Sequence, residues 1–133
     1  MKQKLLLIII LVSQSFVYAQ AQKASKILSC WQFNKIEFLF PVEDSANMIE
    51  RYSPMVSCYF ENGKLTVKMV RNSEVIGTHD IKYKISADEK FIFNQQTESD
   101  NGYDTMFEIL TLDDKQLILK SDSLIFYFVK LKE

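Results

Sequence analysis

The chain has 133 residues, with 16 basic and 17 acidic side chains and a formal net charge of −1. Its mild acidity, without a cluster of lysine or arginine, argues against nucleic acid or an anionic membrane surface as a partner. The length predicts one small domain, and a single histidine excludes a zinc site that needs two.

Residues 1–21 have the pattern of a bacterial signal peptide. Lys2 and Lys4 precede the apolar run Leu5–Val12, and a polar stretch that ends in small residues follows. This run is far shorter than the roughly 20 apolar residues that a membrane-spanning helix needs. We therefore predict no integral membrane span.

Signal-peptide cleavage sets the start of the mature domain. Small residues allow cleavage after Ala19 or after Ala21, and both sites stay open. We take residues 22–133 as the domain, which loses two lysines with the leader and has a net charge of about −3. The predicted location is extracytoplasmic, either periplasmic or secreted.

The two cysteines, Cys30 and Cys58, have more than one interpretation. The letters of residues 27–30 imitate a lipid-anchoring site, but a long polar stretch separates Cys30 from the apolar run, so lipid anchoring is not favoured. An oxidising compartment permits a disulfide between the two cysteines. Two buried free thiols are the alternative, and both interpretations stay open.

Alternation of apolar and polar residues, broken by short turn signals, runs through the mature chain and indicates an all-β meander. Asn62-Gly63 favours a type I′ hairpin turn, and most other connections are short and polar. Eight strands are predicted: Trp31–Phe38, Met55–Glu61, Lys64–Val70, Val75–Ile85, Lys90–Gln96, Thr105–Leu112, Gln116–Lys120 and Leu124–Leu131.

Short connections place successive strands side by side and antiparallel. An open sheet of this size exposes two edges, whereas closure removes them, so we predict an up-and-down barrel and not a sandwich. One segment, residues 41–54, departs from the β pattern. Asp44 or Ser45 can cap a short helix there, with Met48, Ile49 and Tyr52 on its apolar face. We expect this helix to lie across one mouth of the barrel.

Several stretches resemble the small lipocalin-like proteins of bacteria, which belong to the calycin group of β-barrels. They are Trp31 at the start of the first strand, YFENGKLTV as the second hairpin, YKI followed by KFIF, FEILTLDDKQLIL as a late hairpin, and the closing strand LIFYFVKLK. The resemblance covers essentially the whole mature chain. It implies an eight-stranded barrel and suggests a binding protein.

The resemblance also implies a role for Trp31. In that group a G-x-W motif begins the first strand, and a late arginine or lysine packs over the tryptophan ring at the closed end of the barrel. Ser29 stands in the place of the glycine here, and Lys130 or Lys132 would supply the cation. We expect Trp31 and Lys130 to form a structural plug, with ligand contact by Trp31 as the alternative.

An eight-stranded barrel has a lumen that side chains fill or that holds one small ligand. Val67 and Met69 share one face of the third predicted strand, and His79 shares the parity of Tyr83 on the fourth. With Tyr52 from the helix, these residues are the candidate ligand-binding set. For His79 we favour a structural role near the start of its strand.

No nucleophilic triad, metal-ligand spacing or cofactor motif is found, so we predict a protein that is not an enzyme and needs no cofactor or metal. The stretch TESDNGYD gathers Glu98, Asp100 and Asp104 around Gly102, but it lacks the regular spacing of a calcium loop. We expect a solvated acidic turn there.

The last predicted strand is apolar on both faces, and either the N-terminal segment or a second subunit is expected to cover its outer face. The leading hypothesis is a binding protein for a small apolar or amphipathic ligand that enters past residues 40–52. The alternative is a structural or protein-interaction domain with a filled barrel. A homodimer that forms through the last strand is a further alternative that the sequence leaves undecided.

Overall fold

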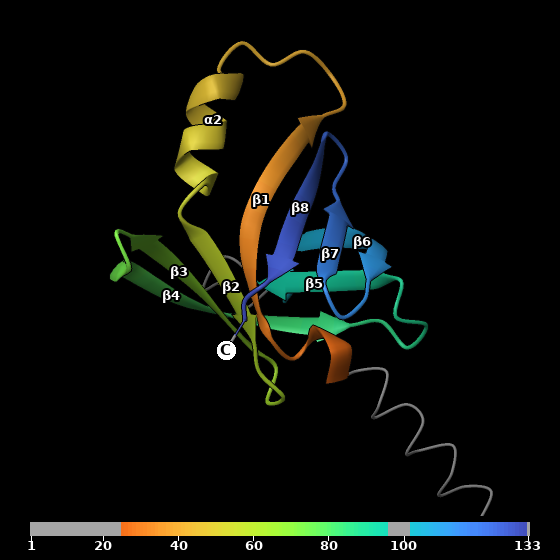
Figure 1. Ribbon diagram of the computed structural model, residues 1–133. Coiled ribbons are helices and arrows are strands. Elements are labelled where there is room, and N and C mark those ends of the chain that lie inside the picture. The colour runs from red at the N-terminus through yellow and green to blue at the C-terminus, as the bar shows by residue number, and fades with distance from the viewer. Residues whose placement is uncertain (1–24, 96–101, 133) are drawn as a thin grey trace, which may run out of the picture.

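Eight antiparallel strands in chain order form a closed barrel in the computed structural model, which describes residues 25–95 and 102–132 (Figure 1). Strand β8 pairs back with β1 to close it. The elements are η1 (Ser25–Ile27), β1 (Cys30–Phe38), α2 (Ser45–Tyr52), β2 (Met55–Tyr59), β3 (Lys64–Arg71), β4 (Glu74–Ile85), β5 (Phe91–Gln95), β6 (Thr105–Leu112), β7 (Gln116–Lys120) and β8 (Leu124–Lys130). The predicted all-β barrel with one short helix after the first strand is confirmed.

The turn after β2 differs from the prediction. A type I′ turn needs a positive φ at both central residues, but at this hairpin only Gly63 has one, at +82°. Gly63 donates its N–H to the Phe60 carbonyl and Phe60 donates to the Lys64 carbonyl, which makes a three-residue loop with glycine in the left-handed position. The type I′ pattern lies at Asn72 and Ser73 instead, with φ of 51° and 65°.

A β-bulge at Asn34 changes which residues of β1 face the lumen. The pairing with β8 shifts between Phe33 and Lys35, so Phe33 lies opposite Phe128 and Ile36 lies opposite Phe126. Both β1 residues join the hydrophobic core although they are three positions apart. The bulge thus keeps the apolar residues of β1 inside while the strand bends.

The core is densest at the end of the barrel where β1 begins and β8 ends, which we call the closed end. Trp31, Ile92 and Leu117 are 0% exposed there, and the Trp31 indole Nε1 donates to the Ile27 carbonyl at 3.0 Å. Cys30 and Cys58 lie opposite each other on β1 and β2 and form a disulfide. The bond ties the first two strands together beside the tryptophan.

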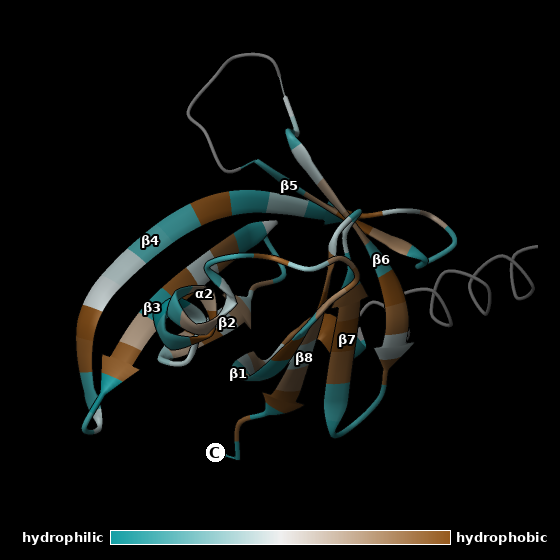
Figure 2. Cartoon of the chain, turned by 90° about the horizontal axis from the view of Figure 1, so that it is seen from above, coloured by the Kyte–Doolittle hydropathy of each residue, from teal (hydrophilic) through white to brown (hydrophobic). Residues whose placement is uncertain are grey.

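The opposite end, which we call the mouth, carries α2. Viewed down the barrel, α2 lies over the opening enclosed by the strands (Figure 2). The helix has no buried residue, and Ile49 is 42% exposed. Asp44 is its N-cap residue, but its side chain makes no capping hydrogen bond and instead accepts one from Asn47 at 2.6 Å. The predicted helix is present, and it packs loosely.

The outer face of β8 is partly covered by its neighbour β1. The Tyr127 hydroxyl donates to Glu37 Oε2 at 2.9 Å, and the Lys35 ammonium lies 4.4 Å from the centre of the Tyr127 ring. Val129 remains 37% exposed. A dimer through this strand stays a prediction. Within the two described stretches, no helix is long and apolar enough to cross a membrane.

Candidate functional site

A small cavity occupies the barrel lumen between α2 and the closed end. Its volume is about 120 Å³, and most of its wall is aromatic or aliphatic. Residues from seven strands, β2 to β8, and the helix contribute: Tyr52, Met55, Ser57, Tyr59, Leu65, Val67, Ile81, Asn94, Phe107, Leu119, Phe126 and Phe128. The lumen is therefore mostly filled by side chains but not completely.

Tyr52, the last residue of α2, connects the helix to the cavity. Its ring stacks on Phe33 with centroids 6.0 Å apart and meets Phe126 edge-on at 5.4 Å. Phe126 in turn meets Phe107 edge-on at 6.0 Å. Edge-to-face contacts of this kind add to the stabilisation from burial alone. Tyr52 thus covers the cavity on the mouth side, and α2 cannot lift without breaking these ring contacts.

Two tyrosines meet on the lumen side of β2 and β4. The rings of Tyr59 and Tyr83 are perpendicular with centroids 4.9 Å apart, and the Tyr83 hydroxyl donates to the Phe60 carbonyl at 2.7 Å. Burial raises the pKa of Tyr59 well above its usual range, and the neighbouring Tyr83 raises it further. Burial also raises the pKa of Tyr83. Both phenols are therefore neutral at physiological pH.

Two neutral polar residues interrupt the apolar wall. Ser57 on β2 and Asn94 on β5 are each 5% exposed. Asn94 Oδ1 has no hydrogen-bond partner among the described residues. Buried amide oxygens are nearly always paired in native proteins, so this atom marks the polar point of the cavity.

The structure brings only part of the predicted ligand-binding set together. Tyr52 and Val67 line the cavity, whereas Met69, His79 and Tyr83 do not. His79 pairs with Val67, so its parity follows the prediction, but its side chain is exposed. His79 is exposed because β4 is a long strand of 12 residues whose first half extends past the mouth of the barrel. Tyr83 is buried and lies behind Tyr59.

Sequence reasoning missed Ser57 and Asn94. A signal for Asn94 exists in the alternation of FIFNQ, where Asn94 shares a face with Ile92, which is completely buried. A polar residue at an inward position of a barrel strand is the observation that could have identified it. Ser57 shares the inward parity with Met55 and Tyr59 and could have been found in the same way.

The two residues of the plug predicted from the resemblance, Trp31 and Lys130, both lie at the closed end. Trp31 is completely buried, and Lys130 lies opposite it in the β1–β8 pairing. The Lys130 side chain is exposed. The lysine–ring contacts in the described part of the chain involve Tyr127, Phe60, Phe93 and Tyr103, and none involves Trp31.

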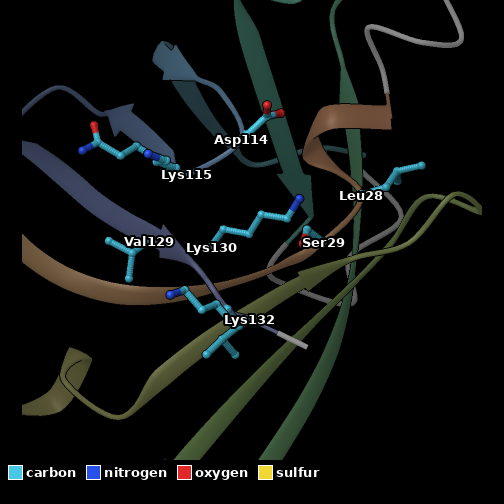
Figure 3. Close-up of a pocket in the computed structure, with 9 residues that line it drawn as sticks. Leu28, Ser29, Asp114, Lys115, Val129, Lys130 and Lys132 are labelled. Atoms are coloured by element: carbon cyan, nitrogen blue, oxygen red, sulfur yellow. The ribbon is translucent and has the colours of Figure 1, made fainter.

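A second, wide hollow of about 920 Å³ lies outside the barrel at the closed end (Figure 3). Leu28, Val129 and Leu131 contribute apolar surface, while Lys115, Lys130, Lys132 and Asp114 contribute charges. In Figure 3 the labelled side chains Leu28, Asp114 and Lys115 lie on other segments than Val129, Lys130 and Lys132, around an open space. The hollow is a feature of the outer surface, and its charged side chains do not converge on one point (Figure 3).

Metal-binding groups are not found among the described residues, where no cluster of three or more His, Cys, Asp or Glu side chains is close enough to hold an ion. Most of the acidic stretch TESDNGYD lies outside the described residues, because the structure omits 96–101. Its expected role as a solvated turn stays a prediction.

Comparison with known proteins identifies a fold relationship. No family model matches the chain, and no curated protein matches it. A lipocalin-like protein from Bacteroides uniformis has a similar structure, with a TM-score of 0.55 and 13% identity over 80% of this chain and 99% of that one. An uncharacterized protein from Bacteroides eggerthii matches with the same TM-score and identity, over 78% of this chain and 98% of that one. The chain therefore has the lipocalin-like fold.

Proposed function

We propose that the protein is an extracytoplasmic binding protein that holds one small apolar or amphipathic molecule in the barrel lumen. The observation that carries the proposal is the cavity of about 120 Å³ under Tyr52. The signal-peptide pattern and the disulfide between Cys30 and Cys58 support the location, because disulfides persist in oxidising compartments. The lipocalin-like fold supports the binding role.

The cavity volume limits the size of the ligand. Pockets for drug-sized ligands measure roughly 300–1,000 Å³, whereas a dry engineered cavity of about 150 Å³ binds benzene. The lumen cavity of about 120 Å³ is close to the second case. The ligand is therefore about the size of one ring or a short branched chain, unless α2 and Tyr52 move outward to enlarge the site.

Native mass spectrometry of the protein purified from producing cells tests the proposal, followed by titration with toluene monitored by NMR. We expect a small-molecule mass that is lost on denaturation, or saturable shifts at Val67 and Phe107. The variant Val67→Phe fills the cavity and should abolish both signals. Val75→Phe is the matched control, because Val75 lies on β4 at the mouth and is 56% exposed.

The proposal fails if no native ligand is detected and neither toluene nor phenol binds, or if Val67→Phe binds as well as the wild type. That result would favour the alternative of a filled barrel that acts as an interaction domain. The exposed apolar residues Val129 and Leu131, beside the lysines of the outer hollow, support this alternative. Sedimentation of the wild type against Val129→Lys would then show whether β8 mediates self-association.

A further inference from the structure

Asn94 occupies an unusual position for an amide side chain. It lies on β5, between Tyr83 of β4 and Thr105 of β6 in the sheet pairing, and its side chain lines the lumen cavity. The residue is 5% exposed, and its Oδ1 accepts no hydrogen bond from the residues that the structure describes. A buried acceptor without a partner destabilises the folded state. An apolar residue at this position would avoid that cost, so a function for the amide would explain why asparagine is found here.

The chemistry around Asn94 restricts what can pair with it. The other cavity residues are apolar or neutral, and the two tyrosines on the closed-end side are held in the protonated form by burial. A charged ligand would lose its hydration without an opposite charge to compensate, which disfavours it strongly. A ligand with no polar group would leave Oδ1 without a hydrogen-bond partner. A neutral ligand with one N–H or O–H donor satisfies the site.

We propose that the lumen selects a small uncharged molecule, about one ring in size, that donates a hydroxyl or N–H hydrogen bond to Asn94 Oδ1. This inference rests on the proposed function and specifies the ligand's polar group. The apolar remainder of the ligand contacts Val67, Phe107 and Phe126. A water molecule is the competing partner, but a buried water typically makes about three hydrogen bonds, and the wall offers few polar atoms.

Three probes of similar size separate the possibilities: phenol has a donor, toluene has none, and benzaldehyde has only an acceptor. Their dissociation constants are measured by NMR titration for the wild type and for Asn94→Leu, which has the same number of side-chain heavy atoms and is apolar. We expect the ratio of the toluene to the phenol dissociation constant to fall about tenfold in Asn94→Leu, since one hydrogen bond contributes about that much. Gln32→Leu, on the exposed face of β1, should leave the ratio unchanged.

A second readout needs no substitution. Phenol should shift the side-chain amide resonances of Asn94 in the wild type, and toluene should shift them much less. Asn94→Leu is also expected to be at least as stable as the wild type without ligand, because it removes the unpaired acceptor. A large loss of stability in this variant would instead show that Asn94 is structural.

The possible failures are distinguishable. If no probe binds the wild type, the proposed function fails together with this inference. If all probes bind and the toluene-to-phenol ratio is the same in Asn94→Leu, the lumen binds ligands but Asn94 does not select them, and only this inference is overturned. If benzaldehyde is the probe that loses affinity in Asn94→Leu, the amide presents its N–H and the ligand is an acceptor.

Discussion

The two ends of this barrel are built differently. At the closed end, Trp31, Ile92 and Leu117 are completely buried, and the Cys30–Cys58 disulfide joins the first two strands. At the mouth, α2 has no buried residue, and the tip of the β3–β4 hairpin leaves Val75 and Ile76 more than half exposed. The contrast indicates that stability is concentrated at the closed end and that the mouth is held more weakly.

Among the tests of this contrast, removal of Trp31 is expected to cause the largest loss of stability. Trp31→Ala should lower the free energy of unfolding by about 4 kcal/mol, because it deletes a fully buried ring and a buried hydrogen-bond donor. Phe40→Ala removes a ring near the mouth that is 65% exposed and should change stability by less than about 0.5 kcal/mol. Urea unfolding monitored by circular dichroism measures both. Equal losses of unfolding free energy in the two variants would show that the two ends do not differ in their contribution to stability.

The disulfide should have the next largest effect. It closes a loop with a sequence separation of 28, and restriction of the unfolded chain by such a loop contributes about 3.5 kcal/mol. Cys30→Ala combined with Cys58→Ala should lower the melting temperature, and reduction of the wild type should lower it by a similar amount. A melting temperature that does not respond to reductant would mean that the strands are held by packing alone.

At the mouth we expect a smaller loss. Tyr52 is half-buried and contacts Phe33 and Phe126, so Tyr52→Ala should cost about 2 kcal/mol, roughly half the loss at Trp31. Tyr52→Phe keeps the ring and serves as the control. Hydrogen exchange should show α2 amides opening well below the global free energy in the wild type. Protection of α2 equal to that of β7 would contradict a loosely held mouth.

Alternation and turn signals predicted the barrel well, because the closed end and most of the sheet obey the period of two. The eight strands lie within two residues of their expected ends, although Gln96, the last residue of the fifth predicted strand, lies outside the described residues. The helix after the first strand was also foreseen. These features depend on local pattern, which is visible in a sequence.

The details of the candidate site were harder to predict, since they depend on how strands are offset around the barrel. Parity placed His79 on the inward face, but it could not show that β4 extends beyond the mouth and leaves the residue exposed. The bulge at Asn34 reverses parity within β1, and no glycine marks it. The pattern of FIFNQ places Asn94 on the inward face, but it cannot show that the amide lines a cavity and has no partner for Oδ1 among the described residues.

The smallest expected effect is a pH dependence that originates beside the cavity. Burial raises the pKa of Tyr59 above the value of about 10 for an unfolded chain, so the folded protein keeps this proton when the unfolded chain has lost it. Tyr59 therefore contributes almost no pH dependence well below about pH 10, and above that pH its contribution destabilises the fold progressively. At pH 11 the loss should be about 1.4 kcal/mol.

Tyr59→Phe isolates this contribution from the lysines, which titrate in the same range. The variant should lose less stability than the wild type between pH 9 and about pH 11, with the difference measured from urea midpoints at each pH. Tyr103→Phe is the matched control, because the Tyr103 ring is 40% exposed and is not enclosed by the barrel. If both variants follow the wild-type curve, Tyr59 is reached by solvent, and the closed end is more open than its burial indicates.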